Sequence, residues 1–297
     1  MLKSLYSGVS GMKGFQTKLD VIGNNVANVN TVGFKKSRVM FQDIISQNIS
    51  GATAPTTSTG GVNPKQIGLG TKISAIETVN TPGSPMTTNV GTDLAIDGDA
   101  YFVVSPDGAK QYLTKAGNFT RDPNGDLVNS NGYYVQGVIN TGATTTPVNI
   151  NITADSKTNN SFTSYSIDQY GYINVVDSKG NSGKLSTTDG KSFYLDDGTG
   201  NANNNIQIAT TVVTNPGGLK KIGNTMFEAT GNSGKADVRR VTENSGGTIN
   251  AGILEMSNVD LTEEFTEMIV AQRGFQANAR TISTSDSILE EIVNLKR

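Results

Sequence analysis

Two close carboxylates are the first residues whose type and spacing could do chemistry. Asp97 and Asp99 flank Gly98 in the run AIDGDAYF, and a pair of aspartates can act as acid and base in a glycosidase. Asp-Gly at the edge of a strand is also an ordinary turn signal that needs no catalytic role. We therefore favour a turn, with a carbohydrate-active β-domain that uses Asp97 or Asp99 as the enzymatic alternative.

Two other runs resemble ligand sites in part. Asp122 to Asp126 has the start of a calcium loop, but Leu127 stands at the sixth position, where glycine is required, and Tyr133 stands at the twelfth instead of Glu. The run DDGTG at residues 196–200 is not followed by a helical pattern, so it does not match a phosphate loop. Both runs predict turns. We expect no catalytic residue, no metal site and no cofactor.

The composition excludes several kinds of side chain that commonly act in catalysis. The 297 residues contain no Cys and no His, which excludes thiolate, zinc-thiolate and imidazole chemistry. The net charge of −2 argues against a nucleic-acid partner. No apolar run approaches the ~20 residues of a membrane span, and the start MLKSLYSGVSGMKGFQTK lacks the apolar region of a secretory signal. We expect no membrane insertion and no signal cleavage.

The beginning of the chain carries a heptad pattern. One apolar column is Leu5, Met12, Leu19 and Val26, and a second contains Leu2 and Val9 before it slips by one residue to Phe15, Ile22 and Val29. Glycine also recurs in this stretch, at Gly8, Gly11, Gly14 and Gly23. Each glycine weakens a helix by roughly 1 kcal/mol relative to Ala, so we expect this helix to be marginal alone.

The end of the chain carries a longer pattern over about 260–296. Its main column is Leu261, Met268, Phe275, Ile282 and Leu289, and its companion column is Phe265, Gln272, Ala279, Asp286 and Val293. Asp260 and Glu263 resemble a capping box at the start of the helix. The pattern predicts one long helix with an apolar stripe, whose ordinary role is to pack on the core of its own domain.

Charge favours a different partner for the stripe. Residues 1–40 hold six bases against one acid, a balance of +5, and residues 255–297 hold eight acids against four bases, a balance of −4. Opposite charges on two heptad helices favour their pairing in a coiled coil.

The middle of the chain has a different period. A Ser-, Thr-, Gly- and Pro-rich run at 46–66 predicts a linker or an extended, mobile segment. Short apolar runs with turn signals from about 70 to 254 predict a mostly antiparallel β-domain, with a small insertion near 141–205.

These elements predict a mixed fold class. We expect a terminal helical domain from residues 1–32 and 255–297, which form an α-helical coiled coil. A connecting segment at 33–69 would join it to a mostly-β central domain at 70–254.

Several runs resemble the bacterial flagellar rod and hook proteins. LDVIGNNVANVNTVGFKKSR at 19–38 is similar to their N-terminal signature, and further similar runs lie at 68–78, 93–104, 209–234 and 254–297. The residues that carry the terminal motifs are Asn24, Asn25, Ala27, Asn28, Thr31, Gly33, Phe34, Asn258, Gln272 and Arg273. Within the family, NVDL at 258–261, the run MIVAQR ending at Arg273, and VNL at 293–295 look more like the hook protein than the distal rod protein.

The resemblance implies an assembly and its partners. The terminal segments would line the channel of a tubular homopolymer, with the β-domain outside. The residues expected in this coiled-coil contact are Leu5, Met12, Leu19, Ile22, Val26, Leu261, Phe265, Met268, Phe275, Ile282, Leu289 and Val293. Subunits would leave the cell through the flagellar type III export apparatus, polymerise beneath the hook cap, and contact neighbouring rod and hook–filament junction proteins.

The function that we expect is a hook subunit, part of a flexible universal joint that carries torque from rod to filament. The alternative is a distal rod subunit, a drive shaft in the basal body, because better-known hook proteins carry a further large outer domain for which this chain has no room. An adhesin-like binding module is a third hypothesis, but paired heptad ends would have no use there.

Overall fold

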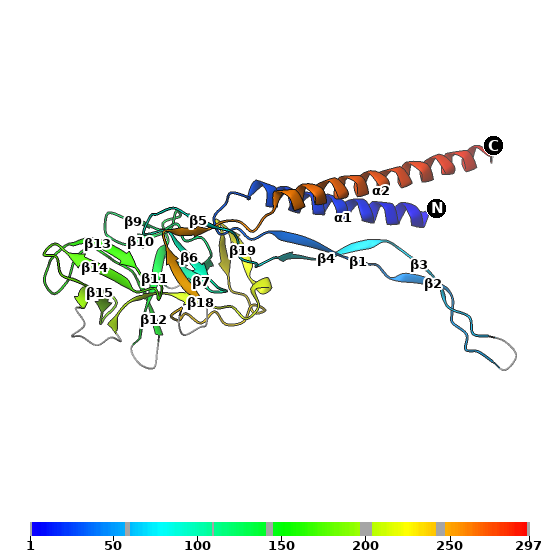
Figure 1. Cartoon of the computed structure of the whole chain (residues 1–297). Helices are drawn as coiled ribbons and strands as arrows, with labels where there is room; N and C mark the ends of the chain where they lie inside the picture. Colours follow the sequence, from blue (N-terminus) through cyan, green and yellow to red (C-terminus); the bar gives the residue numbers. More distant parts are fainter. Residues whose placement is uncertain are drawn as a thin grey trace. The chain divides into compact units, whose positions relative to one another are not determined.

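A computed structural model describes most of the chain (Figure 1). The described residues are 2–56, 60–108, 110–140, 145–196, 204–241 and 247–295, with the side chains of Leu2, Asn140, Thr145 and Thr146 left out. The chain divides into two compact units. Unit 1 consists of Met1–Asn28, Lys36–Val79 and Val259–Arg297, and unit 2 consists of Val29–Lys35 and Asn80–Asn258.

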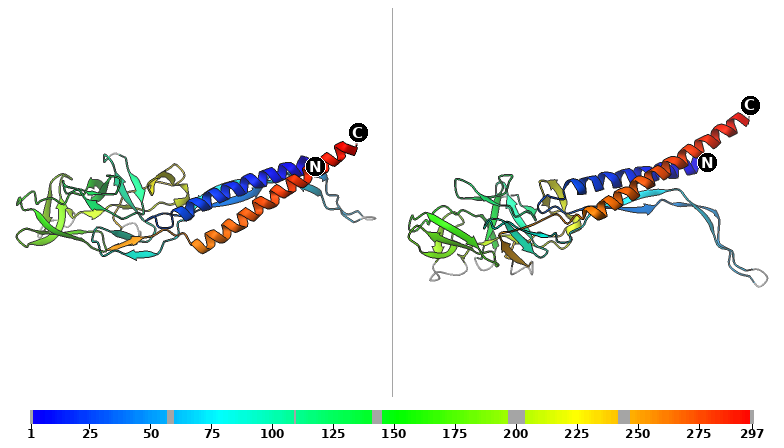
Figure 2. Two further views of the ribbon diagram at one scale, coloured as in Figure 1. Left: turned by 90° about the horizontal axis from the view of Figure 1, so that it is seen from above. Right: turned by 45° about the horizontal axis from the view of Figure 1, so that its top comes forward.

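Unit 1 is built on two long helices. Helix α1 (Leu2–Ala27) and helix α2 (Leu261–Leu295) lie side by side and antiparallel (Figures 1 and 2). The hydroxyls of Ser4 and Ser285 are 3.5 Å apart near one end of the pair. Asp260 caps α2, because its Oδ1 accepts the backbone N–H of Thr262 at 2.8 Å.

A long β-hairpin completes unit 1. Strand β1 (Ser37–Asp43) pairs with β4 (Thr71–Thr78), and β2 (Ser46–Ser50) pairs with β3 (Lys65–Gly68) further along. Helix α1 packs on this hairpin, since the side chain of Phe41 lies where a Cβ on Gly14 would be, and the Ser10 hydroxyl accepts the N–H of Thr71.

The hairpin corrects part of the expected linker. Residues 46–50 and 65 and 66 are paired strands rather than an open segment. Their side chains are exposed on both faces, so these strands carry no apolar alternation that would reveal them in the sequence. Residues 57–59 of that segment lie outside the described residues.

Unit 2 is a β-domain, and every strand pair described in it is antiparallel. Its largest sheet has ten strands, with β19-β20-β8-β7-β11-β10-β9 as its main order and β12, β17 and β18 paired at its side. The strands of this sheet are β7 (Tyr101–Ser105), β8 (Tyr112–Thr114), β9 (Thr120–Arg121), β10 (Leu127–Val128), β11 (Tyr134–Asn140), β12 (Thr145–Asn149), β17 (Gln207–Ile208), β18 (Thr210–Thr211), β19 (Lys220–Gly223) and β20 (Met226–Glu228).

Unit 2 also contains smaller sheets. Strand β5 (Pro85–Thr87) pairs with β22 (Ile253–Glu255), and β6 (Leu94–Asp97) pairs with β21 (Thr248–Ala251). The region expected as an insertion contains a four-stranded meander of β13 (Phe162–Ile167), β14 (Ile173–Asp177), β15 (Ser182–Thr187) and β16 (Phe193–Asp196). Its buried residues, such as Ile173 and Leu185, belong to the same hydrophobic cluster as Phe102 in β7.

The hydrophobic core lies in unit 2. Strand β7 is buried on both faces, because successive side chains alternate between them: Phe102 and Val104 enter the larger cluster, and Tyr101 and Val103 enter the smaller one. Both clusters draw only on unit 2. Among the described residues, no helix is long and apolar enough to cross a membrane.

Candidate functional site

The paired carboxylates lie at a bend. Asp97 is the last residue of β6 and Asp99 precedes β7, and both are exposed. Gly98 between them has φ +146, a conformation that favours glycine. The geometry is therefore that of the turn that the Asp-Gly pair predicts.

The calcium-like run also forms a turn. The Oδ1 atom of Asp122 accepts the N–H of Asp126 at 2.7 Å, and its backbone carbonyl accepts the N–H of Gly125 at 3.0 Å. Within the described ranges, no three acidic residues converge as metal ligands would. Asp196 ends β16, and residues 197–200 of the glycine-containing run lie outside the described residues.

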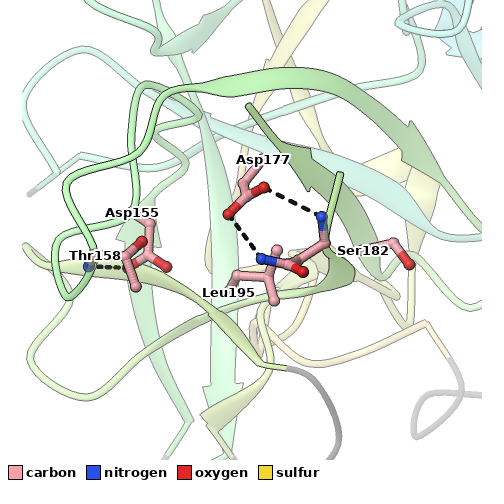
Figure 3. Close-up of a pocket in the computed structure, with 6 residues that line it drawn as sticks. Asp155, Thr158, Asp177, Ser182 and Leu195 are labelled. Carbon is pink, nitrogen blue, oxygen red and sulfur yellow. Dashed lines mark hydrogen bonds between the residues drawn. The ribbon is translucent and has the colours of Figure 1, made fainter. Parts of the chain in front are cut away.

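Unit 2 has an open pocket of about 420 Å³ between its meander and the loop that precedes β13 (Figure 3). Asp155 and Asp177 line it, together with Thr158, Asn181, Ser182 and Leu195. Burial alone would raise the pKa of Asp177, but hydrogen bonds from the backbone of Lys179 and Asn181 and from side-chain amides lower it below its ordinary value. Asp155 likewise accepts backbone N–H groups of its own loop. These carboxylates hold turns together.

The helix pair of unit 1 is the stronger candidate for the functional site, and small residues let its helices approach. A Cβ on Gly11 would lie 2.9 Å from Nδ2 of Asn278, and one on Gly274 would lie 2.6 Å from the ring of Phe15. Larger side chains at these positions would push the helices apart. The glycines that weaken α1 alone are therefore the residues that make room for α2.

Ion pairs also link α2 to α1 and to the residue before β1, as the opposite charge balances of the chain ends predict. Lys18 pairs with Glu267, and Nζ of Lys36 lies 2.7 Å from Glu263 and 3.8 Å from Glu264. These ion pairs form within a single chain. Because most of their atoms are partly exposed, each pair contributes only about 0.2–1 kcal/mol.

The contact between the helices uses heptad columns that sequence reasoning missed. In α1 it follows Ser4, Gly11, Lys18 and Asn25, and in α2 it follows Glu264, Ala271, Asn278 and Ser285. These residues are small or polar, so an apolar pattern cannot find them. Their spacing of seven, with Gly274 beside Ala271, is the signal that could have found them.

Most of the apolar residues expected in the contact lie beside it, but Ile282 takes part in it: a Cβ on Gly8 of α1 would lie 3.1 Å from Cγ1 of Ile282. In α1, Leu5, Met12, Leu19 and Val26 are half-buried, and Ile22 is buried. In α2, Met268, Ile282 and Leu289 are half-buried, Gln272 is exposed, and the large side chains Leu261, Phe265, Phe275 and Val293 are 39%, 49%, 36% and 63% exposed.

Helix geometry places these columns on one side of the pair. Successive residues are about 100° apart around a helix, and in both helices an expected column follows the contact column by one residue: Leu5 follows Ser4, and Phe265 follows Glu264. A step of one residue turns away from the contact in both helices. Because the helices are antiparallel, this step leads to the same side of the pair in each of them. The hairpin contacts α1 through Ser10 and Gly14, on the other side.

The remaining motif residues of the first segment divide between buried and exposed positions. Asn25 and Gly33 are buried, Asn28, Thr31 and Phe34 are half-buried, and Asn24 and Ala27 are exposed. Asn25 donates from Nδ2 to the carbonyl of Ser37 at 2.8 Å and accepts the N–H of Ser37 at 3.0 Å. It thereby ties α1 to β1.

The motif residues near the second helix have local roles. Asn258 donates to the carbonyl and the hydroxyl of Thr81. Arg273 is exposed and donates to Gln276 in the next turn of α2.

Comparisons with known proteins identify the chain's relatives. Family models match at residues 5–35 (flagella basal body rod protein), 95–175 (flagellar hook protein FlgE/F/G D1 domain) and 250–295 (flagellar basal body rod FlgEFG protein C-terminal). The flagellar basal-body rod protein FlgG of Bacillus subtilis is 47% identical over 298 residues, across the full length of both chains. The chain belongs to the flagellar rod and hook protein family.

Hook proteins are similar over the same residues. The flagellar hook protein FlgE of Borreliella burgdorferi is 32% identical over 442 aligned positions, and the FlgG protein of that organism is 36% identical over 301 positions. Each alignment covers both chains completely. As a member of the rod and hook family, the chain is an exported structural component of the bacterial flagellum, which serves motility.

Proposed function

We propose that this protein is a rod subunit of the flagellar basal body, the drive-shaft role, rather than the hook subunit that its terminal motifs led us to expect. One observation carries the proposal. The rod protein of Bacillus subtilis aligns over 298 positions, whereas the Borreliella burgdorferi hook protein aligns over 442, so at least 145 of those positions have no counterpart in these 297 residues. These 297 residues therefore lack the additional residues that the Borreliella burgdorferi hook protein contains.

The assembly that we propose is a tubular homopolymer. The helix pair, from residues 1–32 and 255–297, would form the coiled-coil inner domain that lines the channel. The connecting segment at 33–69 would lead to the outer domain at 70–254. The apolar side of the helix pair, with Phe265 half-exposed, supports contact with further copies, because exposed apolar side chains at regular spacing favour burial in an assembly.

A hook subunit is the second candidate. The flagellar hook protein FlgE of Helicobacter mustelae is 51% identical over 139 residues, although these cover only 46% of this chain and 31% of that protein. In either role the subunit would pass through the type III export apparatus. As a hook subunit it would assemble beneath the hook cap and join the rod to the hook–filament junction proteins.

Deletion of the gene in its own host distinguishes the two roles. A rod subunit is needed before the hook can form, so we expect basal bodies that lack a complete rod and carry no hook. Electron microscopy of purified basal bodies would show this directly. Complete rods without hooks would support the hook role instead.

A further inference from the structure

Residues 29–35, which we call the strap, are held in unit 2 at both backbone and side chain. The N–H of Gly33 donates to the carbonyl of Glu255 at 2.8 Å. Gly33 has φ +68, and a Cβ there would lie 2.5 Å from the backbone nitrogen of Ala116. The strap therefore lies against unit 2 so closely that only glycine fits.

The side chain of Lys35 is buried among groups that bind its ammonium. It is 1% exposed, and its Nζ lies 2.5 Å from Oε1 of Glu255 and donates to the carbonyl of Thr81 at 2.9 Å. The same oxygen of Glu255 accepts the N–H of Gly83 at 3.1 Å. A buried carboxylate and a backbone carbonyl thus converge on one ammonium group.

A second buried ammonium lies in the same region. Lys115 is 5% exposed, and its Nζ donates to the carbonyl of Gly98 at 2.7 Å and lies 5.2 Å from the ring centre of Tyr101. Among the described residues, no carboxylate oxygen lies within 4.0 Å of it. Burial lowers the pKa of Lys115 to about 8, a change that nearby Glu255 opposes and nearby Lys35 increases.

One carboxylate thus serves two cations. Oε2 of Glu255 is buried and has no hydrogen-bond partner among the described residues. A buried charge without a counter-charge is strongly destabilising. With the strap in place, Lys35 neutralises Glu255 and Lys115 lacks a direct counter-ion. With the strap absent, Glu255 would still have Lys115.

We propose that Glu255 and the Thr81 carbonyl form an ammonium-binding site onto which the strap closes through Lys35, and that Lys115 is the cation that neutralises Glu255 when the strap is open. The β-domain then stays folded before the N-terminal segment docks. When the strap closes, Lys35 replaces Lys115 as the counter-ion of Glu255.

The proposal makes strap closure depend on pH. In the closed state the pKa of Lys115 is about 8. In the open state its pKa is higher, because Lys35 no longer lowers it while Glu255 still raises it. Between these values closure releases a proton, so closure strengthens as pH rises above about 8, by up to about tenfold per pH unit. Asp97 and Asp99 raise the pKa of Lys115 slightly, and Tyr101, with a pKa of about 12, stays neutral.

Hydrogen–deuterium exchange of the full chain, read in the peptide that covers residues 29–35, tests the proposal. We expect Lys35→Met to speed exchange of the strap by about tenfold or more while the melting temperature of the β-domain falls little. We expect Lys115→Met to slow exchange of the strap. After correction for base-catalysed intrinsic exchange, it should also remove most of the pH dependence of the strap's protection factor between pH 7 and 9. Lys220→Met, at an exposed lysine on β19, is the control and should change neither.

The double variant Lys35→Met with Lys115→Met separates this proposal from a purely structural ion pair. It leaves Glu255 buried without a cation, so the β-domain should melt at a temperature far below that expected from the sum of the single changes. Additive melting temperatures would overturn the proposal. Faster strap exchange in Lys115→Met would overturn it as well.

Discussion

Asn25 donates a hydrogen bond of 3.1 Å from its side-chain amide to Oε2 of Glu264, which lies 239 residues later in the chain. Both residues are buried, and Asn25 also exchanges two hydrogen bonds with the backbone of Ser37. One side chain therefore joins α1, α2 and the first strand of the hairpin. Because it satisfies three partners at once, no apolar residue can replace it.

Asn25→Ala should destabilise unit 1, since the change leaves the Ser37 backbone and Glu264 without these hydrogen bonds. We expect a loss of about 1–3 kcal/mol. The loss would appear as a lower urea midpoint for helical circular dichroism of assembled polymers. Asn24→Ala is the matched control, because Asn24 is the exposed neighbour, and this change should alter the free energy of unfolding by less than about 0.5 kcal/mol. Equal effects of the two changes would contradict the buried role of Asn25.

Two glycine substitutions should change the stability of the helix pair in opposite directions. A Cβ on Gly23 meets nothing within 4 Å, so Gly23→Ala should gain up to about 1 kcal/mol of helix stability. In Gly274→Ala the new Cβ would overlap the ring of Phe15, and overpacking of this kind costs about 1–3 kcal/mol. Thermal disassembly of the polymer, followed by circular dichroism, measures both changes. A stabilising Gly274→Ala would show that the helices are not in close contact.

Reversal of the pair Lys18–Glu267 should have a small, salt-dependent effect. Lys18→Glu places two carboxylates together, and we expect a loss of about 0.2–1 kcal/mol that shrinks at high salt. The exchange variant Lys18→Glu with Glu267→Lys should restore stability. Lys13→Glu is the control, because Lys13 is exposed and forms no ion pair with any described residue. Failure of the exchange variant to restore stability at low salt would argue against this pairing.

Phe275→Asp should abolish polymerisation and leave the β-domain intact. Phe275 is 36% exposed on α2, and both hydrophobic clusters lie in unit 2, so the substitution does not touch the core. An unpaired carboxylate at a contact between copies costs several kcal/mol, and the loss recurs at every subunit. Calorimetry of the monomer and a sedimentation assay of assembly measure the two effects. Thr284→Asp is the exposed control on α2; a destabilised Phe275→Asp monomer would contradict this placement.

Much of the fold follows from patterns in the sequence. The heptads at the two ends predict α1 and α2, and the continuous apolar run AYFVV at 100–104 reflects a strand that is buried on both faces and enters two hydrophobic clusters. The pairing of the two helices follows from their opposite charges, but the residues in contact between them were harder to predict. The contact depends on Gly11, Gly274 and Asn278, and such residues give no hydrophobic signal.

Polar contacts between distant segments lie beyond sequence patterns. In the sequence, Lys35 is one of six basic residues within residues 1–40. In the structure it is buried against Glu255 in unit 2. Nothing local distinguishes it from Lys36, which is partly exposed beside α2. Only the tertiary fold decides which lysine is buried. The strands β2 and β3 were missed for a related reason, since they pair without burying an apolar face.

Immuno-electron microscopy of purified hook–basal bodies tests the central claim most directly. Antibody raised against unit 2 should label the rod of particles from which the rings have been dissociated, and the hook should stay unlabelled. A rod subunit predicts this pattern. Label along the hook, with none on the rod, would contradict the rod assignment and restore the hook as the site of this protein.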